Sequence, residues 1–310
     1  MVRLAWCVMC LTCAMALGTP TTLASQTRCP SEGVAVQVLG SGGPRTGSDR
    51  ASASYLVWVD GRARVMVDAG GGSFVRFGTS GARLADLRLI ALSHLHPDHV
   101  TDLAGLLWLS DADRVEPLRM VGPSGAGDFP AFDDFLQRLF HPESGAFPVL
   151  SGVLGGEGRG VRTVPNTIDV TQHISSVVLE EAGLRILAHP VPHGPVPALA
   201  FRVEIDGLSV VFSGDQNGSD PAFVEFSEDA TALVMHLAVS PQTSGFASEL
   251  HATPDVVGRV AKSASVRELI LSHLFAHDDP ADLEIGVEEV RARYSGSIRV
   301  AEDLACYPVR

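Results

Sequence analysis

Four potential metal ligands occupy six consecutive positions in the run Ser93-His94-Leu95-His96-Pro97-Asp98-His99. The whole chain has only 11 histidines, so this density is unusual. Imidazole nitrogens and carboxylate oxygens together suit zinc and similar borderline cations. Residues two apart in an extended loop point the same way, so His94 and His96 can grip one cation while Asp98 and His99 reach a second. The run therefore predicts a metal site for two ions rather than a merely polar loop.

The segments around this run must hold it in place. Leu87–Leu92 has the pattern of a short buried strand, and Val100–Trp108 that of a helix that opens directly after the run. The same patterns predict further helices at 131–140 and 254–263, and further strands at 34–39, 54–59, 64–67, 184–188, 199–205, 209–212 and 268–271. Two sheets flanked by helices are the architecture that this order favours.

One stretch of the chain lacks a clear pattern. Residues 111–172 contain the turn Gly122-Pro123-Ser124-Gly125 and a glycine-rich stretch at 155–160. We expect this irregular insertion to form a lid or substrate wall, or merely a surface excursion. With this stretch included, we expect residues 26–310 to form a single domain.

The first residues have the layout of a secretory signal peptide, with cleavage near Ser25. Arg3 precedes an apolar stretch that is shorter than the roughly 20 residues of a membrane span, and small residues follow it. An uncleaved membrane anchor is the alternative. We expect a secreted or periplasmic protein with no membrane attachment after processing of residues 1–25.

Cysteine usage agrees with export. Three of the five cysteines lie in the signal segment, which leaves Cys29 and Cys306 in the mature chain. In an oxidising compartment these two could form a disulfide that ties the ends together, or remain unrelated thiols. Sequence leaves both readings open, because it does not show whether their Cα atoms come within bonding distance.

The charge balance argues against a polyanionic partner. The formal net charge is −13, from 23 Lys and Arg against 36 Asp and Glu, and no run of basic residues interrupts it. Proteins that bind nucleic acids concentrate positive charge in order to displace counterions. We therefore expect a small-molecule ester substrate and no nucleic-acid partner.

An HxHxDH run after a strand resembles the signature of the metallo-β-lactamase superfamily. The rest of that family's pattern follows in order: Val67-Asp68-Ala69-Gly70, Val191-Pro192-His193-Gly194, Phe212-Ser213-Gly214-Asp215 and Leu271-Ser272-His273. The resemblance spans residues 68 to 273. It implies an α/β fold, the αββα metallo-β-lactamase sandwich of two mixed β-sheets flanked by helices.

The resemblance also implies a role for each ligand. One metal is held by His94, His96, His193 and the bridging Asp215, and the other by Asp98, His99, His273 and the same Asp215. Asp68 orients the metal loop from behind the ligands. His189, four residues before His193, is the rival for its place. The implied cofactors are two divalent metal ions, with Zn²⁺ first and Mn²⁺ or iron as alternatives.

Within the superfamily, Val38–Pro44 and His251-Ala252-Thr253 resemble the branch of tRNA 3′-processing endonucleases, arylsulfatases and phosphodiesterases. The branch implies that His251, 22 residues before His273, acts in catalysis beside Asp98. Leu237 stands where the branch often carries an acidic partner, which puts a proton-donating His251 in doubt. The alternative is that His251 is a surface or capping histidine, and we interpret His236 as a buried structural one.

These features together favour an exported dinuclear hydrolase, in which metal-activated water attacks a small phosphodiester or sulfate ester. A lactonase or another ester hydrolase of the same fold is the alternative, because lactonases keep the Asp215 position. A tRNA 3′-processing endonuclease is a weaker alternative on grounds of export and charge, and a non-catalytic metal-binding protein is the weakest. Relatives often dimerise, so a homodimer is a further expectation.

Overall fold

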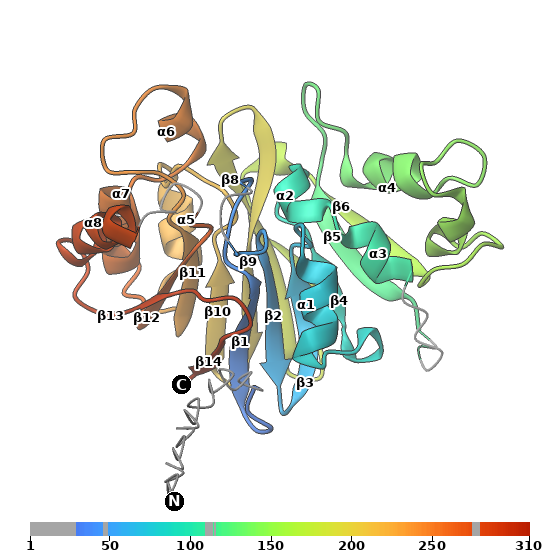
Figure 1. Ribbon diagram of the computed structural model, residues 1–310, viewed down its shortest axis with the longest axis horizontal. Coiled ribbons are helices and arrows are strands. Elements are labelled where there is room, and N and C mark those ends of the chain that lie inside the picture. The colour runs from blue at the N-terminus through green and yellow to red at the C-terminus, as the bar shows by residue number, and fades with distance from the viewer. Residues whose placement is uncertain (1–28, 46–48, 109–113, 115, 275–279) are drawn as a thin grey trace, which may run out of the picture.

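The computed structural model describes residues 29–45, 49–108, 114, 116–274 and 280–310. The predicted signal segment, residues 1–25, lies outside them. The described chain forms four layers, with two seven-stranded sheets face to face and helices on both outer surfaces (Figure 1). This arrangement confirms the αββα sandwich.

The first sheet has the strand order β14-β1-β2-β3-β4-β5-β6. Its antiparallel part pairs β14 with β1, β1 with β2 and β2 with β3, and its parallel part continues through β4, β5 and β6. The sheet is therefore mixed. Its strands are β1 (Val34–Gly40), β2 (Ser54–Val59), β3 (Arg62–Val67), β4 (Leu89–Ala91), β5 (Leu118–Pro123), β6 (Thr163–Ile168) and β14 (Cys306–Val309).

The second sheet has the order β13-β12-β11-β10-β9-β8-β7 and is mixed in the same way. Strands β10 to β13 are parallel, whereas β7 to β10 pair antiparallel. Its strands are β7 (Ser176–Glu181), β8 (Leu184–His193), β9 (Val196–Ile205), β10 (Leu208–Phe212), β11 (Ala232–His236), β12 (Glu268–Ser272) and β13 (Ser297–Val300).

Helices close both outer faces. The inner faces of the two sheets share one apolar core, and a separate cluster lies between each sheet and its helices. The first sheet is covered by α1 (Ser73–Ser80), α3 (Leu103–Trp108) and α4 (Phe132–Phe140), and the second by α5 (Pro221–Phe226), α7 (Pro254–Ser263) and α8 (Pro280–Arg291). The longest of these, α8, has 12 residues, and no described helix is long and apolar enough to span a bilayer.

The segment 111–172 differs from our expectation of an irregular insertion. Within its described part, β5 and β6 extend the parallel side of the first sheet, and α4 and a 3-10 helix (Pro148–Leu154) pack nearby. Strand β6 is an edge strand that carries Pro165, and its three consecutive residues 164–166 are exposed. Proline is tolerated on such edges. In the sequence, however, it interrupts the alternation of apolar and polar residues by which a strand is predicted.

The helix expected at 100–108 is divided. It forms α2 (Pro97–Val100), which begins inside the metal-binding run, and α3. Pro97 starts α2, where the ring fixes the first helical torsion and no backbone donor is lost. Asp98 and His99 therefore sit on the first turn of a helix rather than in a loop.

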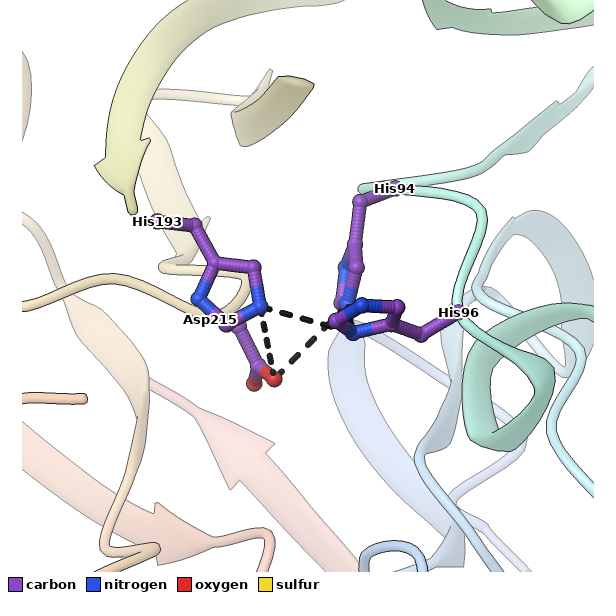
Figure 2. A group of neighbouring side chains, drawn as sticks. All are labelled: His94, His96, His193 and Asp215. Carbon is purple, nitrogen blue, oxygen red and sulfur yellow. Dashed lines mark hydrogen bonds and ion pairs between the residues drawn. The ribbon is translucent and has the colours of Figure 1, made fainter. Parts of the chain in front are cut away.

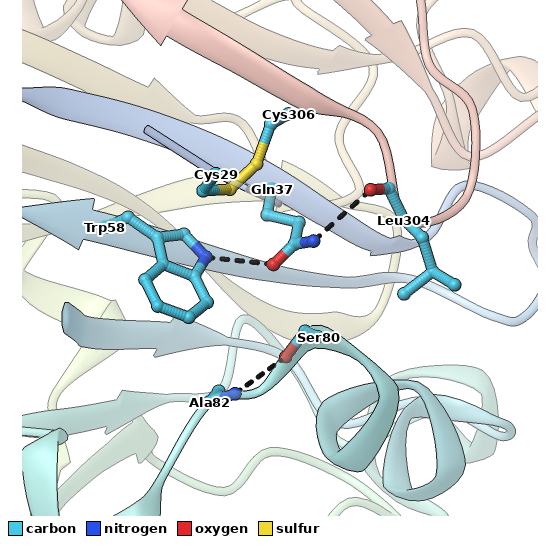
Figure 3. The surroundings of a disulfide bond; sticks show 7 residues. All are labelled: Cys29, Gln37, Trp58, Ser80, Ala82, Leu304 and Cys306. Carbon is cyan, nitrogen blue, oxygen red and sulfur yellow. Dashed lines mark hydrogen bonds between the residues drawn. A yellow bond between two sulfur atoms is a disulfide. The ribbon is translucent and has the colours of Figure 1, made fainter. Parts of the chain in front are cut away.

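A disulfide joins Cys29 to Cys306, 277 residues apart in sequence, with their Cα atoms 5.4 Å apart (Figure 3). It links the segment before β1 to the first residue of β14. Beside it, Gln37 donates from Nε2 to the carbonyl of Leu304 and accepts from Trp58 Nε1. The bond and these contacts attach the C-terminal strand to the first sheet.

Candidate metal centre

The candidate ligands gather at the carboxyl ends of strands. Strands β3 and β4 of the first sheet are parallel, as are β10 and β12 with β11 between them, so their ends meet at one edge of each sheet. Asp68 follows β3, the HxHxDH run follows β4, His193 ends β8, Asp215 follows β10 and His273 follows β12. Open α/β sheets bind ligands outside the carboxyl ends of their strands for this reason.

The first ligand set consists of His94, His96, His193 and Asp215, whose donor atoms all lie within 4.8 Å of one another. Nε2 of His94 lies 3.0 Å from Nδ1 of His96, and Nε2 of His193 lies 3.5 Å from that same atom. Oδ2 of Asp215 is 3.7 Å from His94 and 3.6 Å from His193. Figure 2 shows the three rings and the carboxylate turned toward a common point.

The second set consists of Asp98, His99 and His273. Nε2 of His273 lies 3.2 Å from both Nε2 of His99 and Oδ2 of Asp98. Asp215 again closes the group, because its Oδ2 is 3.7 Å from His99 and its Oδ1 is 3.5 Å from His273. One carboxylate therefore faces both sets, as a bridging ligand must.

These separations fit metal ions. A cation bound tetrahedrally at about 2.1 Å keeps its ligand atoms about 3.4 Å apart, and the measured separations scatter around that value. Burial lowers the pKa of His94, His96 and His193, so their rings are neutral and offer lone pairs. Two cations held here would lower the pKa of a shared water toward about 7 and stabilise both the attacking and the leaving oxygen.

Asp68 lies behind the ligands, as the resemblance implied. Its Oδ1 accepts from the backbone N–H of Ser93 at 2.7 Å, and its Oδ2 lies 2.8 Å from both the Ser93 hydroxyl and Nδ1 of His99. The carboxylate thus fixes the start of the metal loop and turns Nε2 of His99 toward the second set. Burial lowers the pKa of His99, but without a bound metal Asp68 and Asp215 together outweigh it and raise that pKa to about 10, so a metal ion that binds to Nε2 of His99 must displace its proton.

The two ligand carboxylates remain ionised despite their burial. Desolvation alone would raise the pKa of Asp215, but the charges of His273 and His99 and the bond from His236 hold it well below its ordinary value. In Asp98 the hydrogen bond with His273 and the charge of His99 likewise overcome burial and lower the pKa to about 2. Both groups therefore bind as anions over the physiological range.

His251 lies beside the centre but outside both sets. It ends α6 (Phe246–Leu250), with Nδ1 3.8 Å from Oδ2 of Asp215 and a ring centroid 5.3 Å from that of His193. Its side chain is 11% exposed. Burial lowers its pKa to about 3, and the attraction of Asp215 does not compensate. His251 is thus a neutral imidazole beside the two ligand sets.

Two other histidines, His189 and His236, differ in their relation to the centre. His189 packs on Phe226 and contacts Ser175 and Asp220, so it belongs to neither ligand set and does not replace His193. His236 is buried, as expected, but it contacts the centre: Nδ1 lies 2.5 Å from Oδ1 of Asp215. The signal for this contact was its position at the end of β11, the strand between β10 and β12.

Comparison with known proteins decides the family. Residues 63–274 match the β-lactamase superfamily domain. The chain belongs to that superfamily. Ribonuclease Z of Mycolicibacterium paratuberculosis is 30% identical over 297 residues, covering 87% of this chain and 96% of the relative. Among solved structures, the short form of human tRNase Z has a TM-score of 0.67 at 20% identity, covering 89% of this chain and 99% of that one. A diphosphatase of the PhnP family has a TM-score of 0.61 at 19% identity, covering 88% and 97%.

These relatives confirm the predicted branch of the superfamily and the assignment as a metal-dependent hydrolase of ester bonds. The clusters of histidine and aspartate are consistent with divalent metals in this hydrolase. The ribonuclease names stand against our expectation that nucleic acid is no partner, although the identity to those relatives is low. The superfamily therefore settles the reaction class and leaves the substrate to be argued from the site.

Proposed function

We propose that this superfamily member hydrolyses a small phosphodiester or sulfate ester with two divalent ions, zinc first among them. The observation that carries the proposal is the convergence of two ligand sets on Asp215, with neutral His251 beside them. Such a pair of ions activates a water and shields one anionic ester group. Asp98 and His251 are the side chains that we assign to catalysis.

The lack of Lys and Arg in the segments that carry most of the candidate ligands favours a small substrate. The sequence has no Lys or Arg at 89–113, 120–137, 186–201 or 203–258, the segments that carry nearly all of the candidate ligands and their neighbours. Two metal ions suffice for one anionic ester group. A polyanion needs further positive charge along its length. A chain with a formal net charge of −13 does not favour such a partner.

Aromatic side chains flank the first ligand set on two sides. The ring of Phe129 packs edge-on to His96 at 5.6 Å between centroids. Phe246 begins α6 and is 61% exposed. Its ring lies 3.9 Å from the position that a Cβ on Gly194, the residue after His193, would occupy. These rings offer contact area for an apolar or aromatic ester substituent.

RNA is the second candidate, favoured by the names of the relatives. The ribonuclease Z of Mycolicibacterium paratuberculosis matches 87% of this chain, and the short human tRNase Z has the same fold. A phosphodiester within RNA would require the same water attack. What differs is docking of the strand, for which the four segments named above, which carry most of the candidate ligands, have no basic side chains.

A substrate screen on the purified protein distinguishes these candidates. We expect turnover of bis(p-nitrophenyl) phosphate or p-nitrophenyl sulfate, with little cleavage of a tRNA precursor that carries a 3′ extension. A lactone tests the remaining ester hydrolases. Preferential cleavage of the tRNA precursor would overturn the small-substrate proposal, and activity on the lactone alone would move the enzyme to that class.

Metal analysis supplies the control for the same screen. The protein should hold close to two ions per chain, and Asp215→Ala should lose most of the second and nearly all activity, because it removes the shared ligand. Full occupancy of both sites in Asp215→Ala would remove Asp215 from the bridge. No activity at all in a fully loaded wild-type protein would favour the non-catalytic alternative.

We further propose that the enzyme is exported to the periplasm or secreted. The support is the apolar segment after Arg3 and the disulfide between Cys29 and Cys306, a bond typical of oxidising compartments. Protein isolated from its native host should begin near Ser25 or Gln26. Retention of Met1 in its intact mass would contradict export with cleavage.

A further inference from the structure

The bridging carboxylate presents its two oxygens to different neighbours. Oδ2 of Asp215 lies among His94, His99 and His193 at 3.6 to 3.7 Å. Oδ1 lies 2.5 Å from Nδ1 of His236, which is much closer than any of those contacts. The rotation of the carboxylate about its own axis is thus set by His236, on the side away from the first ligand set.

His236 is held in turn from the opposite sheet. Its other nitrogen, Nε2, lies 3.2 Å from the hydroxyl of Tyr55, and that hydroxyl is 2.9 Å from Oγ of Ser272. Tyr55 belongs to β2 of the first sheet and reaches across the core that the two sheets share, whereas Ser272 ends β12 directly before the ligand His273. Tyr55 therefore connects the strand ends that carry Asp215 and His273.

All members of this chain of contacts are buried. The exposed fractions are 1% for Tyr55, 6% for His236, 2% for Asp215 and 0% for Ser272. Water therefore cannot easily replace a lost partner, and each buried polar group depends on the others. The ring of Tyr55 packs in the apolar core between the sheets, and its hydroxyl is a polar group that the first sheet supplies to His236.

The donors and acceptors form a consistent order. A carboxylate oxygen only accepts, so the proton of the Asp215–His236 bond is on Nδ1. In a neutral imidazole the other nitrogen is then an acceptor. The single proton of the Tyr55 hydroxyl is directed to Oγ of Ser272, so it can serve Nε2 of His236 when Ser272 in turn donates to the tyrosine oxygen. Removal of that hydroxyl would leave Nε2 of His236 buried without a donor and free the ring to turn.

We propose that Tyr55 is a positioning residue for the metal centre. Through His236 it orients Asp215 so that Oδ2 faces both ligand sets. The proposal rests on Asp215 being the shared ligand, but not on the identity of the substrate. Outer partners of metal ligands typically contribute about 10- to 100-fold in metal affinity or activity, which is the range we expect for the Tyr55 hydroxyl.

The grouping of Asp215, His236 and His273 suggests a competing role. Their donor atoms also lie within 4.8 Å of one another, so His236 could itself bind a metal ion. The two roles differ in what Tyr55 does. A ligand His236 would bind metal through a nitrogen of its own and would depend little on the tyrosine hydroxyl, whereas a positioning His236 would depend on it strongly.

The test compares Tyr55→Phe with Tyr294→Phe. Tyr294 is also buried, and its hydroxyl donates to the carbonyl of Val266 at 2.8 Å, remote from the ligands. Each variant deletes one buried hydroxyl. Zinc affinity is measured by competition with a chelator, without substrate. We expect Tyr55→Phe to weaken the second ion about 10- to 100-fold, and Tyr294→Phe to leave zinc affinity unchanged.

His236→Asn completes the experiment, because its amide nitrogen can take the place of Nδ1 beside Asp215 but cannot reach Tyr55. In that background the further change Tyr55→Phe should have no added effect on zinc affinity, since the contact is already lost. An undiminished effect there would overturn the proposal. So would equal zinc affinities for the two tyrosine variants, or loss of an ion in His236→Ala with normal affinity in Tyr55→Phe, which would make His236 a ligand.

Discussion

At the scale of single residues, the neutral state of His251 limits what it can contribute. Its pKa of about 3 means that it reaches the substrate without the extra proton of an imidazolium. Leu237, which stands where the branch often carries an acidic residue, is fully buried in the apolar cluster under the second sheet. We therefore expect the metal ligands to dominate catalysis and His251 to help only where the leaving group needs a proton.

Substitution of His251 should consequently depend on the leaving group. General acids contribute about 10²- to 10⁴-fold, and we expect His251→Ala to lower kcat/KM for an alkyl ester at the low end of that range. A nitrophenyl ester, whose leaving group needs no proton, should retain most of its rate. The ratio of the two losses is the measurement. Equal losses would show that His251 binds the substrate's anionic oxygens instead.

The titration of buried histidines also predicts how the metal-free protein responds to pH. The pKa is lowered to about 4 in His236 and about 3 in His251, and raised to about 10 in His99. Histidine in an unfolded chain titrates near 6.5. Below that pH His236 and His251 bind protons in the unfolded chain but stay neutral in the folded chain, so the free energy of unfolding falls. Above it only the folded chain keeps the proton on His99, and this contribution is lost as the pH approaches 10.

We therefore expect the free energy of unfolding of chelator-treated protein to be highest near pH 6.5. Each histidine contributes a slope of up to about 1.4 kcal/mol per pH unit on its own side of the maximum. Urea denaturation at pH 5, 6.5 and 8 measures this. His251→Gln should flatten only the acid side, and a stability that rises steadily from pH 6.5 to 8 would contradict the role given to His99.

At the scale of elements, the centre depends on how abruptly each strand turns after its last residue. Strand β10 ends at Phe212, and the chain then turns through Gly214 at φ +58° to bring Asp215 between the sheets. A Cβ on Gly214 would lie 2.6 Å from the carbonyl oxygen of Leu199 in β9. Glycine is needed there for both its torsion and its size.

Gly214→Ala should accordingly lower the free energy of unfolding by more than the backbone strain at a positive φ alone would. Gly207, in the turn between β9 and β10, has φ +76° and open space around the position of a Cβ, so it is the matched control. We expect Gly207→Ala to lose about 1 kcal/mol and leave zinc stoichiometry intact. Gly214→Ala should lose more and bind less than two ions. Similar stability and metal content in both variants would show that the strand end tolerates displacement.

At the scale of the whole molecule, the first described residue, Cys29, and the C-terminal strand β14 meet far from the metal edge. Strand β1 runs in the same direction as β3, which ends at Val67 directly before Asp68, so β1 begins at the opposite end of the first sheet. The disulfide of Cys29 lies just before that beginning, and β14 forms the edge of the sheet only through its pairing with β1. The bond therefore supports the sheet rather than the centre.

Replacement of both cysteines by serine should destabilise the protein without disabling it. Disulfides typically contribute about 2–4 kcal/mol, and we expect a loss of that order in urea denaturation of the double variant. Zinc content and activity below the melting temperature should stay near those of the wild type. Loss of bound metal in the folded double variant would show that the attachment of the C-terminal strand affects metal binding at the centre.

The sequence by itself determined the superfamily and the identities of the candidate ligands. These depend on residue types at short spacings, such as the HxHxDH run, and on motifs that occur in order along the chain. Elements with a strong local pattern also agreed closely, as with the strand at 54–59 and the helix at 254–263. Local spacing and periodicity survive in one dimension, so these features could be predicted.

Only the tertiary structure decided which distant residues meet. Tyr55 read as one apolar strand residue among many, and its contact with His236 depends on how two sheets face each other. Strand β6 became visible only through its pairing with β5, and the bond between Cys29 and Cys306 only through the pairing of β1 with β14. Contacts across 181 or 277 residues depend on the packing of whole sheets, which no local pattern encodes.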